Sequence, residues 1–286
     1  MATDVFTDNR PLLFSVAYRL TGSVADAEDV VQDAWLRWSR VDADGVREPK
    51  AYLVKTVTNL ALTELTSARA RRETYVGPCL PEPLLTSPDS AEGVEMAESV
   101  SLAMLVVLES LSPLERAVFV LGEVFGYGQA EIGQMIDRDP AAVRQLAHRA
   151  REHVQARRPR YTTDAATQAD LVARFRDACA GGDLAAMMEI LAPDVTAWSD
   201  GGGKVTAARR PLHGADNVAR GLLGVLAPPG TQGLEMTIAT INGAPGLIGS
   251  YGGEVVGSVS LDVDDGRVVD IRMTVNPDKL GGLRDR

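Results

Sequence analysis

Residues 138–160 concentrate side chains that can bind nucleic acid. Seven arginines stand in this run against two acidic residues, Asp139 and Glu152, although the 286-residue chain as a whole carries a formal charge of −10. General affinity for nucleic acid comes from neutralising many phosphates, so this net charge excludes a protein that coats nucleic acid through bulk positive charge. A nucleic-acid role must therefore be local. Taken alone, such a basic run favours a solvated helix face.

The spacing around this run predicts two helices joined by a tight turn. Ile132 and Met135 give a short helix over 129–136 an inward face, Asp139 can cap the next helix, and Pro140 suits its first position. The second helix then presents a polar face made of Arg144, Gln145, His148, Arg149 and Arg151. In the major groove Arg can bond guanine and Gln can bond adenine, while further arginines meet phosphates. A basic helical hairpin in a structural bundle remains the alternative.

Candidates for acid–base or metal chemistry are few. Asp200, His213 and Asp216 could supply a general base, because a pocket carboxylate with a raised pKa can abstract a proton. The three glycines after Asp200 instead favour a turn whose backbone approaches another surface, with any Asp200–Lys204 ion pair exposed. Cys79 and Cys179 lack the spacing of a zinc site and are expected to be reduced thiols. We therefore predict no catalytic residue, no metal site and no cofactor.

Glycine divides the chain into two kinds of architecture. Only 8 of the 27 glycines lie in residues 1–160. Apolar periodicity there predicts helices over 10–21, from a Ser23 cap through Trp38, from Pro49 onward, and from about 92 to 158. Between them, residues 77–90 hold four prolines and form a stiff linker.

The last part of the chain mixes helices and strands. We predict a helix over about 164–180, a second ending near Leu191, and then strands at 195–199, 236–241, 247–251, 255–263 and 268–275. Helices followed by a run of strands indicate an α+β domain with a mainly antiparallel sheet. No run is apolar enough to cross a bilayer, and the acidic start differs from a secretory signal, so we expect a cytoplasmic protein.

Several segments together resemble a bacterial extracytoplasmic-function sigma factor. They are residues 26–38, residues 52–61, residues 111–121 and the helix-turn-helix, in the order and at the separations typical of that family. Three shorter motifs, at 75–83, 200–204 and 276–280, are similar to the group with a fused SnoaL-like C-terminal domain. Cys79 stands where that group usually has Trp, and Thr63 and Thr66 stand where relatives tend to have Asp and Arg.

The resemblance implies two partners, RNA polymerase core enzyme and promoter DNA. The acidic helix would bind the coiled-coil clamp of the polymerase through Asp26, Glu28, Asp29, Gln32 and Asp33. The melted minus-10 strand would be held by Tyr52, Lys55, Thr58, Asn59, Arg69, Arg71 and Arg72, with Tyr52 either a stacking platform or a core residue. The minus-35 element would be read by Arg144, Gln145, His148, Arg149 and Arg151.

The implied fold is multidomain: two all-α sigma domains, the second with a helix-turn-helix, followed by an α+β SnoaL-like cone-shaped domain. We expect sigma region 2 in 1–74, a Pro-rich linker in 75–95, region 4 in 96–160 and the SnoaL-like domain in 161–286. That domain would act as a tethered regulator, since a covalently linked contact is effective even when weak. The expected regulatory contact comprises Tyr75, Pro78, Leu80, Pro81, Glu82, Pro83, Asp200, Gly201, Gly202, Gly203, Lys204, Asn276, Pro277, Asp278, Lys279 and Leu280.

One alternative function remains open from the sequence. The SnoaL-like fold hosts enzymes and non-catalytic modules alike, so the fold does not settle activity. In the alternative, the protein is bifunctional and this domain binds or converts a small apolar metabolite. A plain repressor is disfavoured, because residues 26–38 and 52–72 would then have no task.

Overall fold

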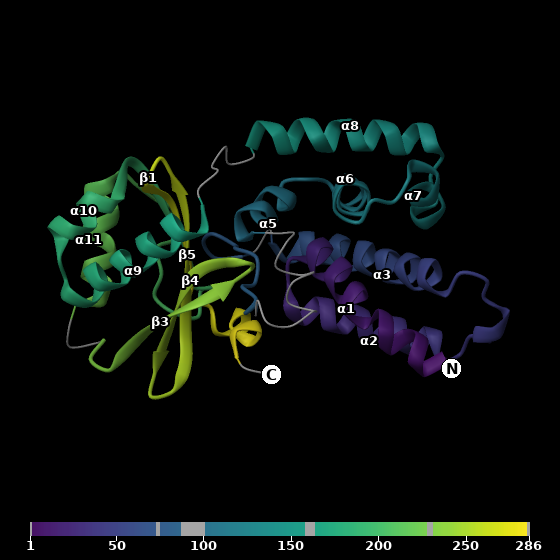
Figure 1. The fold of residues 1–286 in the computed structure, drawn as a ribbon, viewed down its shortest axis with the longest axis horizontal. Helices are drawn as coiled ribbons and strands as arrows, with labels where there is room; N and C mark the ends of the chain where they lie inside the picture. The colour runs from purple at the N-terminus through teal and green to yellow at the C-terminus, as the bar shows by residue number, and fades with distance from the viewer. Residues whose placement is uncertain (1, 73–74, 87–100, 158–163, 228–230, 285–286) are drawn as a thin grey trace. The chain divides into compact units, whose positions relative to one another are not determined.

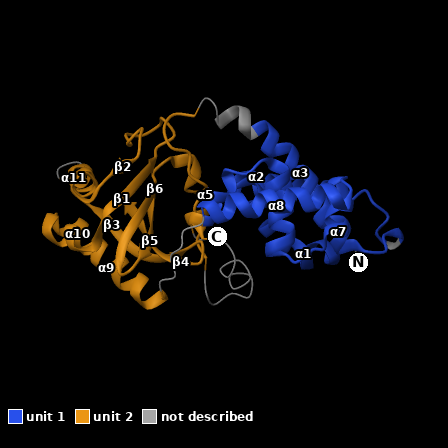
Figure 2. Ribbon diagram, turned by 90° about the horizontal axis from the view of Figure 1, so that it is seen from above, with its two compact units in different colours: residues 1–74, 104–158 blue, residues 75–103, 159–286 orange. Residues whose placement is uncertain are grey.

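A computed structural model describes residues 2–72, 75–86, 101–157, 164–227 and 231–284. The chain forms two compact units, coloured blue and orange in Figure 2. Unit 1 comprises residues 1–74 and 104–158, and unit 2 comprises residues 75–103 and 159–286. No helix in the described ranges is long and apolar enough to cross a membrane.

Unit 1 begins with three helices, α1 (Ala2–Thr21), α2 (Val24–Trp38) and α3 (Pro49–Arg72), with a short turn of 3-10 helix at Ala43–Gly45 (Figure 1). The predicted start of α1 at residue 10 is wrong, because Pro11 lies inside the helix. The helix extends further since Phe6, 6% exposed, packs edge-on against Trp35. As predicted, Ser23 caps α2 by accepting a hydrogen bond from the Asp26 N–H.

The remaining helices of unit 1 are α6 (Pro113–Phe119), α7 (Gln129–Ile136) and α8 (Pro140–Arg157), with a π-helical turn at Val120–Val124. They follow α5 (Leu102–Glu109), whose residues from Met104 onward belong to unit 1. Helix α6 starts at a capping box, in which Ser112 and Glu115 satisfy each other's backbone N–H groups. The expected inward residues of α7 and α8 are buried, including Ile132, Met135 and Val143. The helix-turn-helix prediction is confirmed.

Within unit 1, helices α1 and α3 pack against helices α6 and α7. Helix α3 contacts both α6 and α7. The Arg116 Nε donates a hydrogen bond to the Arg19 carbonyl at 2.9 Å, and both arginines are almost completely buried. The Arg19 guanidinium lies 5.2 Å from the centre of the Phe125 ring. Burial lowers the pKa of Arg19 to about 10.

Unit 2 contains a six-stranded sheet of order β2-β1-β6-β5-β4-β3. The strands are β1 (Leu191–Asp200), β2 (Leu212–His213), β3 (Leu234–Ile241), β4 (Ala244–Tyr251), β5 (Glu254–Asp264) and β6 (Arg267–Thr274). Strands β1 and β6 pair in parallel and every other neighbouring pair is antiparallel, so the prediction of a mainly antiparallel sheet is confirmed.

Three helices cover one face of this sheet (Figure 1), namely α9 (Ala165–Gly181), α10 (Leu184–Ile190) and α11 (Ala215–Leu226). They bury a core with the strands around Phe175, Met187 and Ile271. The sequence does not predict α11, because its two interior glycines, Gly221 and Gly224, lower helix propensity. Burial of Val218 and Leu222 against the sheet outweighs that cost.

Residues 75–86 of the expected linker pack within unit 2. Leu85 forms an antiparallel bridge with Ile241, and its neighbour Leu84 accepts a hydrogen bond from the Asn242 N–H at 2.9 Å. Residues 80–84 are all buried. The prolines keep this segment extended, as expected. The segment packs against the end of β3, however, and does not lie free in solvent.

Candidate functional site

The turn between α7 and α8 is fixed by local chemistry. Asp139 accepts a hydrogen bond from the Ala142 N–H at 2.9 Å and so caps α8, as predicted. Asp137 ends α7 in the left-handed region, with φ 58°. A Cβ on Gly133 would lie 2.5 Å from the Arg138 carbonyl oxygen, so only glycine fits there. Sequence reasoning missed Gly133, although a glycine six residues before the Asp139 cap was a visible signal.

The polar face of α8 lies open to solvent. Val143, Leu146 and Ala150 are buried beneath it, and the outer residues Arg144, Gln145, His148, Arg149 and Arg151 are all exposed. Neither Arg144 nor Gln145 has a side-chain hydrogen bond or ion pair within the described residues. A bidentate contact to a base edge therefore requires no existing side-chain bond to break at these two positions.

Acidic side chains hold the later arginines of α8. The Arg149 Nε lies 3.0 Å from a Glu115 carboxylate oxygen, and Arg151 bonds Glu123 at 2.8–2.9 Å. His148 lies 3.5 Å from Glu152. Burial alone would raise the pKa of Glu115, but hydrogen bonds from Ser112 and the charges of Arg149 and His153 lower it. These carboxylates order the arginine side chains on the surface of α8.

The expected minus-10 residues separate into outward and inward groups on α3. Lys55 is exposed, and Tyr52 is half-buried with its ring centre 5.7 Å from that of Trp38. The Asn59 side-chain amide donates to the Met135 carbonyl of α7 at 2.9 Å. The side chains of Arg69, Arg71 and Arg72 lie outside the described residues.

Thr58 requires a correction. It is 0% exposed, and its hydroxyl has no hydrogen-bond partner in the described ranges. The reason is its place in the helix, where it shares the buried stripe of Val54, Val57 and Ala61. Thr58 therefore lies in the buried interior of unit 1 and not on the solvent-exposed face of α3.

The acidic face of α2 is on the outside of unit 1. The inner face buries Val30, Val31 and Trp38, while Asp29, Gln32 and Asp33 are exposed. Asp26 is half-buried beside the Ser23 cap, and Glu28, also half-buried, bonds Arg10 at 2.6 Å. All five expected polymerase-binding residues thus lie away from the buried stripe of this helix.

Three distant segments of unit 2 meet at Asp200. This residue is 0% exposed, and its carboxylate accepts four hydrogen bonds. The donors are the Tyr75 hydroxyl at 2.5 Å, the Leu80 N–H at 2.9 Å, the Lys279 ammonium at 2.8 Å and the Gly202 N–H at 3.1 Å. We call Tyr75, Cys79, Leu80, Asp200, Asn276 and Lys279 the linker clamp.

Lys279 and Asn276 complete the linker clamp. The Lys279 ammonium also donates to the Leu80 carbonyl at 2.5 Å and to the Cys79 sulfur at 3.2 Å, so all three of its protons have acceptors. The Asn276 amide donates to the Tyr75 hydroxyl at 2.9 Å. Burial alone would lower the pKa of Lys279, but Cys79 and the Asp200 carboxylate raise it above its ordinary value. Burial, followed by the hydrogen bond to Asp200, raises the pKa of Tyr75 to about 12.

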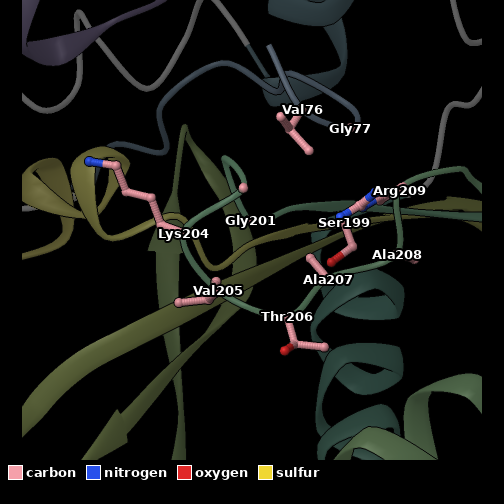
Figure 3. Close-up of a pocket in the computed structure, with 11 residues that line it drawn as sticks. Val76, Gly77, Ser199, Gly201, Lys204, Val205, Thr206, Ala207, Ala208 and Arg209 are labelled. Atoms are coloured by element: carbon pink, nitrogen blue, oxygen red, sulfur yellow. The ribbon is translucent and has the colours of Figure 1, made fainter.

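The glycines after Asp200 permit close backbone contacts. A Cβ on Gly202 would lie 2.4 Å from the Asn276 amide nitrogen, and one on Gly203 would lie 3.1 Å from the Val76 Cβ. Both glycines have positive φ. The same turn borders a cleft of about 350 Å³ beside Val76 and Gly77 (Figure 3). The expectation that this backbone approaches another surface is confirmed, and the surface is the linker.

An Asp200–Lys204 ion pair, which would have been a surface feature, does not form. Asp200 pairs with Lys279 in the interior, while exposed Lys204 pairs with Asp278. Of the other expected contact residues, Pro78 is half-buried, Pro277 is exposed, and Pro81, Glu82, Pro83 and Leu280 are buried. Sequence reasoning missed Leu84 and Asn242, whose mutual hydrogen bonds extend the linker contact. An Asn-Gly turn at 242–243 was the available signal.

The candidate acid–base residues do not form a catalytic group. The Asp200 carboxylate is held in the linker clamp, exposed His213 lies 3.3 Å from the Thr196 hydroxyl, and exposed Asp216 pairs with Arg220. The described residues contain no cluster of three or more His, Cys, Asp or Glu side chains able to hold a metal ion.

Comparisons with known proteins define the class first. Sigma-70 region 2 matches residues 5–71, and Sigma-70 region 4 matches residues 101–154. The chain thus has the two conserved regions of a sigma-70-type transcription initiation factor.

Full-length relatives define the family. The chain is 40% identical to ECF RNA polymerase sigma factor SigJ of Mycobacterium tuberculosis, over 100% of this chain and 96% of the relative. It is 30% identical to the probable ECF RNA polymerase sigma factor SigI of the same species, over 96% and 93%. The crystal structure of SigJ matches with a TM-score of 0.79 and 38% identity, over 98% of each chain. This chain belongs to the extracytoplasmic-function family of RNA polymerase sigma factors.

Proposed function

We propose that the protein binds core RNA polymerase through the acidic face of α2 and acts with it in the cytoplasm, where it directs initiation at promoters read by α3 and α8. The exposed Arg144 and Gln145 support base reading by α8, and Arg149 and Arg151 are suited to phosphates. On α3, Tyr52, Lys55 and Asn59 are the proposed minus-10 residues, with Arg69, Arg71 and Arg72 holding backbone.

We further propose that the C-terminal domain restrains the sigma regions through the linker clamp. The observation that carries this proposal is the completely buried Asp200, whose carboxylate joins Tyr75, Leu80 and Lys279. Residues 75–86 lie between α3 and α5 along the chain, so clamping them shortens the segment left free to let sigma regions 2 and 4 separate. Asn59, a proposed DNA-reading residue, is meanwhile bonded to α7.

Transcription in vitro tests the restraint. Full-length Asp200→Ala should give several-fold more transcript than the parent chain at equal concentrations of core polymerase and promoter DNA, because its linker is released. Lys204→Ala is the matched control, since it removes a charge from the same turn but leaves the clamp intact. Both proteins should retain the circular dichroism of a folded α+β chain. Equal transcript from Asp200→Ala and the parent would contradict the restraint.

The sigma assignment itself has a separate test. Core polymerase with the full chain should initiate from defined sequences in a promoter library, and a chain ending near Arg160 shows what the extension contributes. If neither binds core polymerase nor initiates, the proposed DNA and polymerase contacts fail.

The proposal includes a non-enzymatic role for the C-terminal domain. Its apolar cavity is lined, among described residues, by no Asp, Glu, His or Lys. Cys179 lies on its wall, but burial raises the pKa of this thiol to about 12, so it stays protonated. These features favour ligand binding over the conversion of a metabolite.

A further inference from the structure

Unit 2 holds a cavity of about 390 Å³ between the sheet and its covering helices. Its wall is mostly apolar and includes Phe175, Leu222, Met236, Leu247, Val259 and Met273. No charged side chain is among the described residues that line it. Cavities of about 300–1,000 Å³ with such walls are typical of small-molecule sites.

Exposed apolar residues gather at this cavity. Val225, Tyr251 and Val256 line it, although they are 73%, 54% and 42% exposed. Apolar side chains left exposed around a hollow mark a surface that gains stability when it is covered. Among the polar residues that line the cavity, Ser199 is 7% exposed, and its hydroxyl makes no hydrogen bond within the described part of the chain. It is therefore available to a hydrogen-bonding group of a ligand.

The cavity and the linker clamp share their supporting backbone. Ser199 lines the cavity, whereas the next residue of β1, Asp200, holds the clamp. After β6, Val275 lines the cavity and Asn276 bonds Tyr75. Successive residues of an extended chain point to opposite faces, so each segment reaches both sites.

The turn after β1 makes a second connection. Ser199, Thr206, Ala207 and Ala208 line both the cavity and the cleft beside the linker residues Val76 and Gly77 (Figure 3). A molecule in the cavity would contact one side of this wall while the linker contacts the other.

We infer that this cavity binds a neutral, largely apolar small molecule with one hydrogen-bonding group, and that its occupancy strengthens the linker clamp. A ligand that binds only when the shared wall is ordered stabilises that wall. By linkage, the ligand strengthens linker binding by the same coupling free energy by which the bound linker strengthens ligand binding. The regulatory consequence rests on the proposed restraint, but ligand binding and coupling are measured without transcription, so their failure is distinguishable from failure of that restraint.

Two dyes with the same ring system test the ligand class. N-phenyl-1-naphthylamine is neutral, and 1-anilinonaphthalene-8-sulfonate is its anionic counterpart. The full chain should bind the neutral dye saturably, with enhanced fluorescence, and bind the sulfonate at least about tenfold more weakly, because burying an unpaired charge is costly. Absence of saturable binding of the neutral dye, or equal affinity for both dyes, overturns the proposal.

Two substitutions on β4 locate the dye. Gly249→Leu should block the cavity, because its Cβ would lie 3.6 Å from Leu234 and 3.9 Å from Val256, in ordinary contact with two wall residues. Ser250→Leu, the next residue, lies outside the cavity wall and should bind normally. Val256→Trp provides a second block should Gly249→Leu fail to fold. Normal dye binding by a folded blocked variant overturns the location.

Hydrogen exchange tests the coupling. The N–H groups of Leu80, Leu84, Leu85 and Thr86 are bonded within unit 2. Saturating neutral dye should slow their exchange at least about threefold in the parent chain and in Ser250→Leu, and leave it unchanged in Gly249→Leu. Unchanged exchange in the parent chain, despite saturable binding, overturns the coupling.

Discussion

The linker clamp and the outer face of α8 use the same kinds of charged group in opposite surroundings. In the clamp, Asp200 is 0% exposed and its partners come from three segments of unit 2. On α8, the side chains of Arg149 and Arg151 are 53% and 49% exposed, next to Glu115 and Glu123. A buried pair loses its solvation permanently, so removing one partner is costly. An exposed pair such as Arg151–Glu123 contributes little stability and is easily exchanged for phosphate.

This difference separates two roles for charge within one chain. Buried charges specify which segments meet, because an unpaired charge in the interior would be strongly destabilising. Exposed arginine side chains remain accessible to a binding partner. Nearby carboxylates orient these side chains but can be replaced by the partner's phosphates. The clamp is therefore suited to holding a linker, and α8 is suited to a polyanionic partner.

The largest effect is expected from breaking the buried pair. Asp200→Ala leaves the Lys279 ammonium without its carboxylate and should lower the free energy of unfolding of unit 2 by about 3–5 kcal/mol. Lys204→Ala, which breaks the exposed pair with Asp278, should cost at most about 1 kcal/mol. Urea titrations followed by circular dichroism measure both. Equal costs would erase the distinction between buried and exposed pairs.

A smaller effect is expected on the exposed face. Arg144→Ala should weaken promoter binding by the holoenzyme by about 1–3 kcal/mol and relax the sequence preference at one position. Arg151→Ala should weaken binding to all sequences alike and reduce the salt slope by about 1. Binding to a promoter library at several salt concentrations separates these outcomes. Arg174→Ala on α9, an exposed arginine of the other unit, is the control.

Thr58 is a third case, because it is buried and polar but uncharged. Thr58→Val replaces a hydroxyl that has no partner in the described residues, and should raise the free energy of unfolding of unit 1 by about 1 kcal/mol. Promoter binding should be unchanged if Thr58 is a core residue. Loss of promoter binding without loss of stability would instead restore Thr58 to the minus-10 site.

The smallest effect is a dependence on alkaline pH. The unfolded chain releases the Tyr75 proton near pH 10, whereas the folded chain keeps it to about pH 12. Between these values the unfolded state binds fewer protons, so stability is full below pH 10 and falls as the pH rises. Tyr75→Phe should remove this contribution from the slope of unfolding free energy against pH. An identical slope in both proteins would show that burial does not protect the Tyr75 proton.

The sequence alone determined the local features of this protein. The Ser23 and Asp139 caps, the buried stripes of α7 and α8, and most strands follow from residue type and spacing, because those signals act over a few residues. Motif resemblance similarly identified the family and brought Asp200, Asn276 and Lys279 into one candidate contact.

Only the tertiary structure decided which groups are partners. It paired Asp200 with Lys279 and Lys204 with Asp278. It also turned Thr58 inward, formed α11 despite its glycines, and brought Asn242 to Leu84. These outcomes depend on contacts between residues as far as 158 positions apart. These pairings are stabilised by burial and desolvation that arise only when distant segments pack together. Residues that are neighbours in the sequence do not encode such contacts.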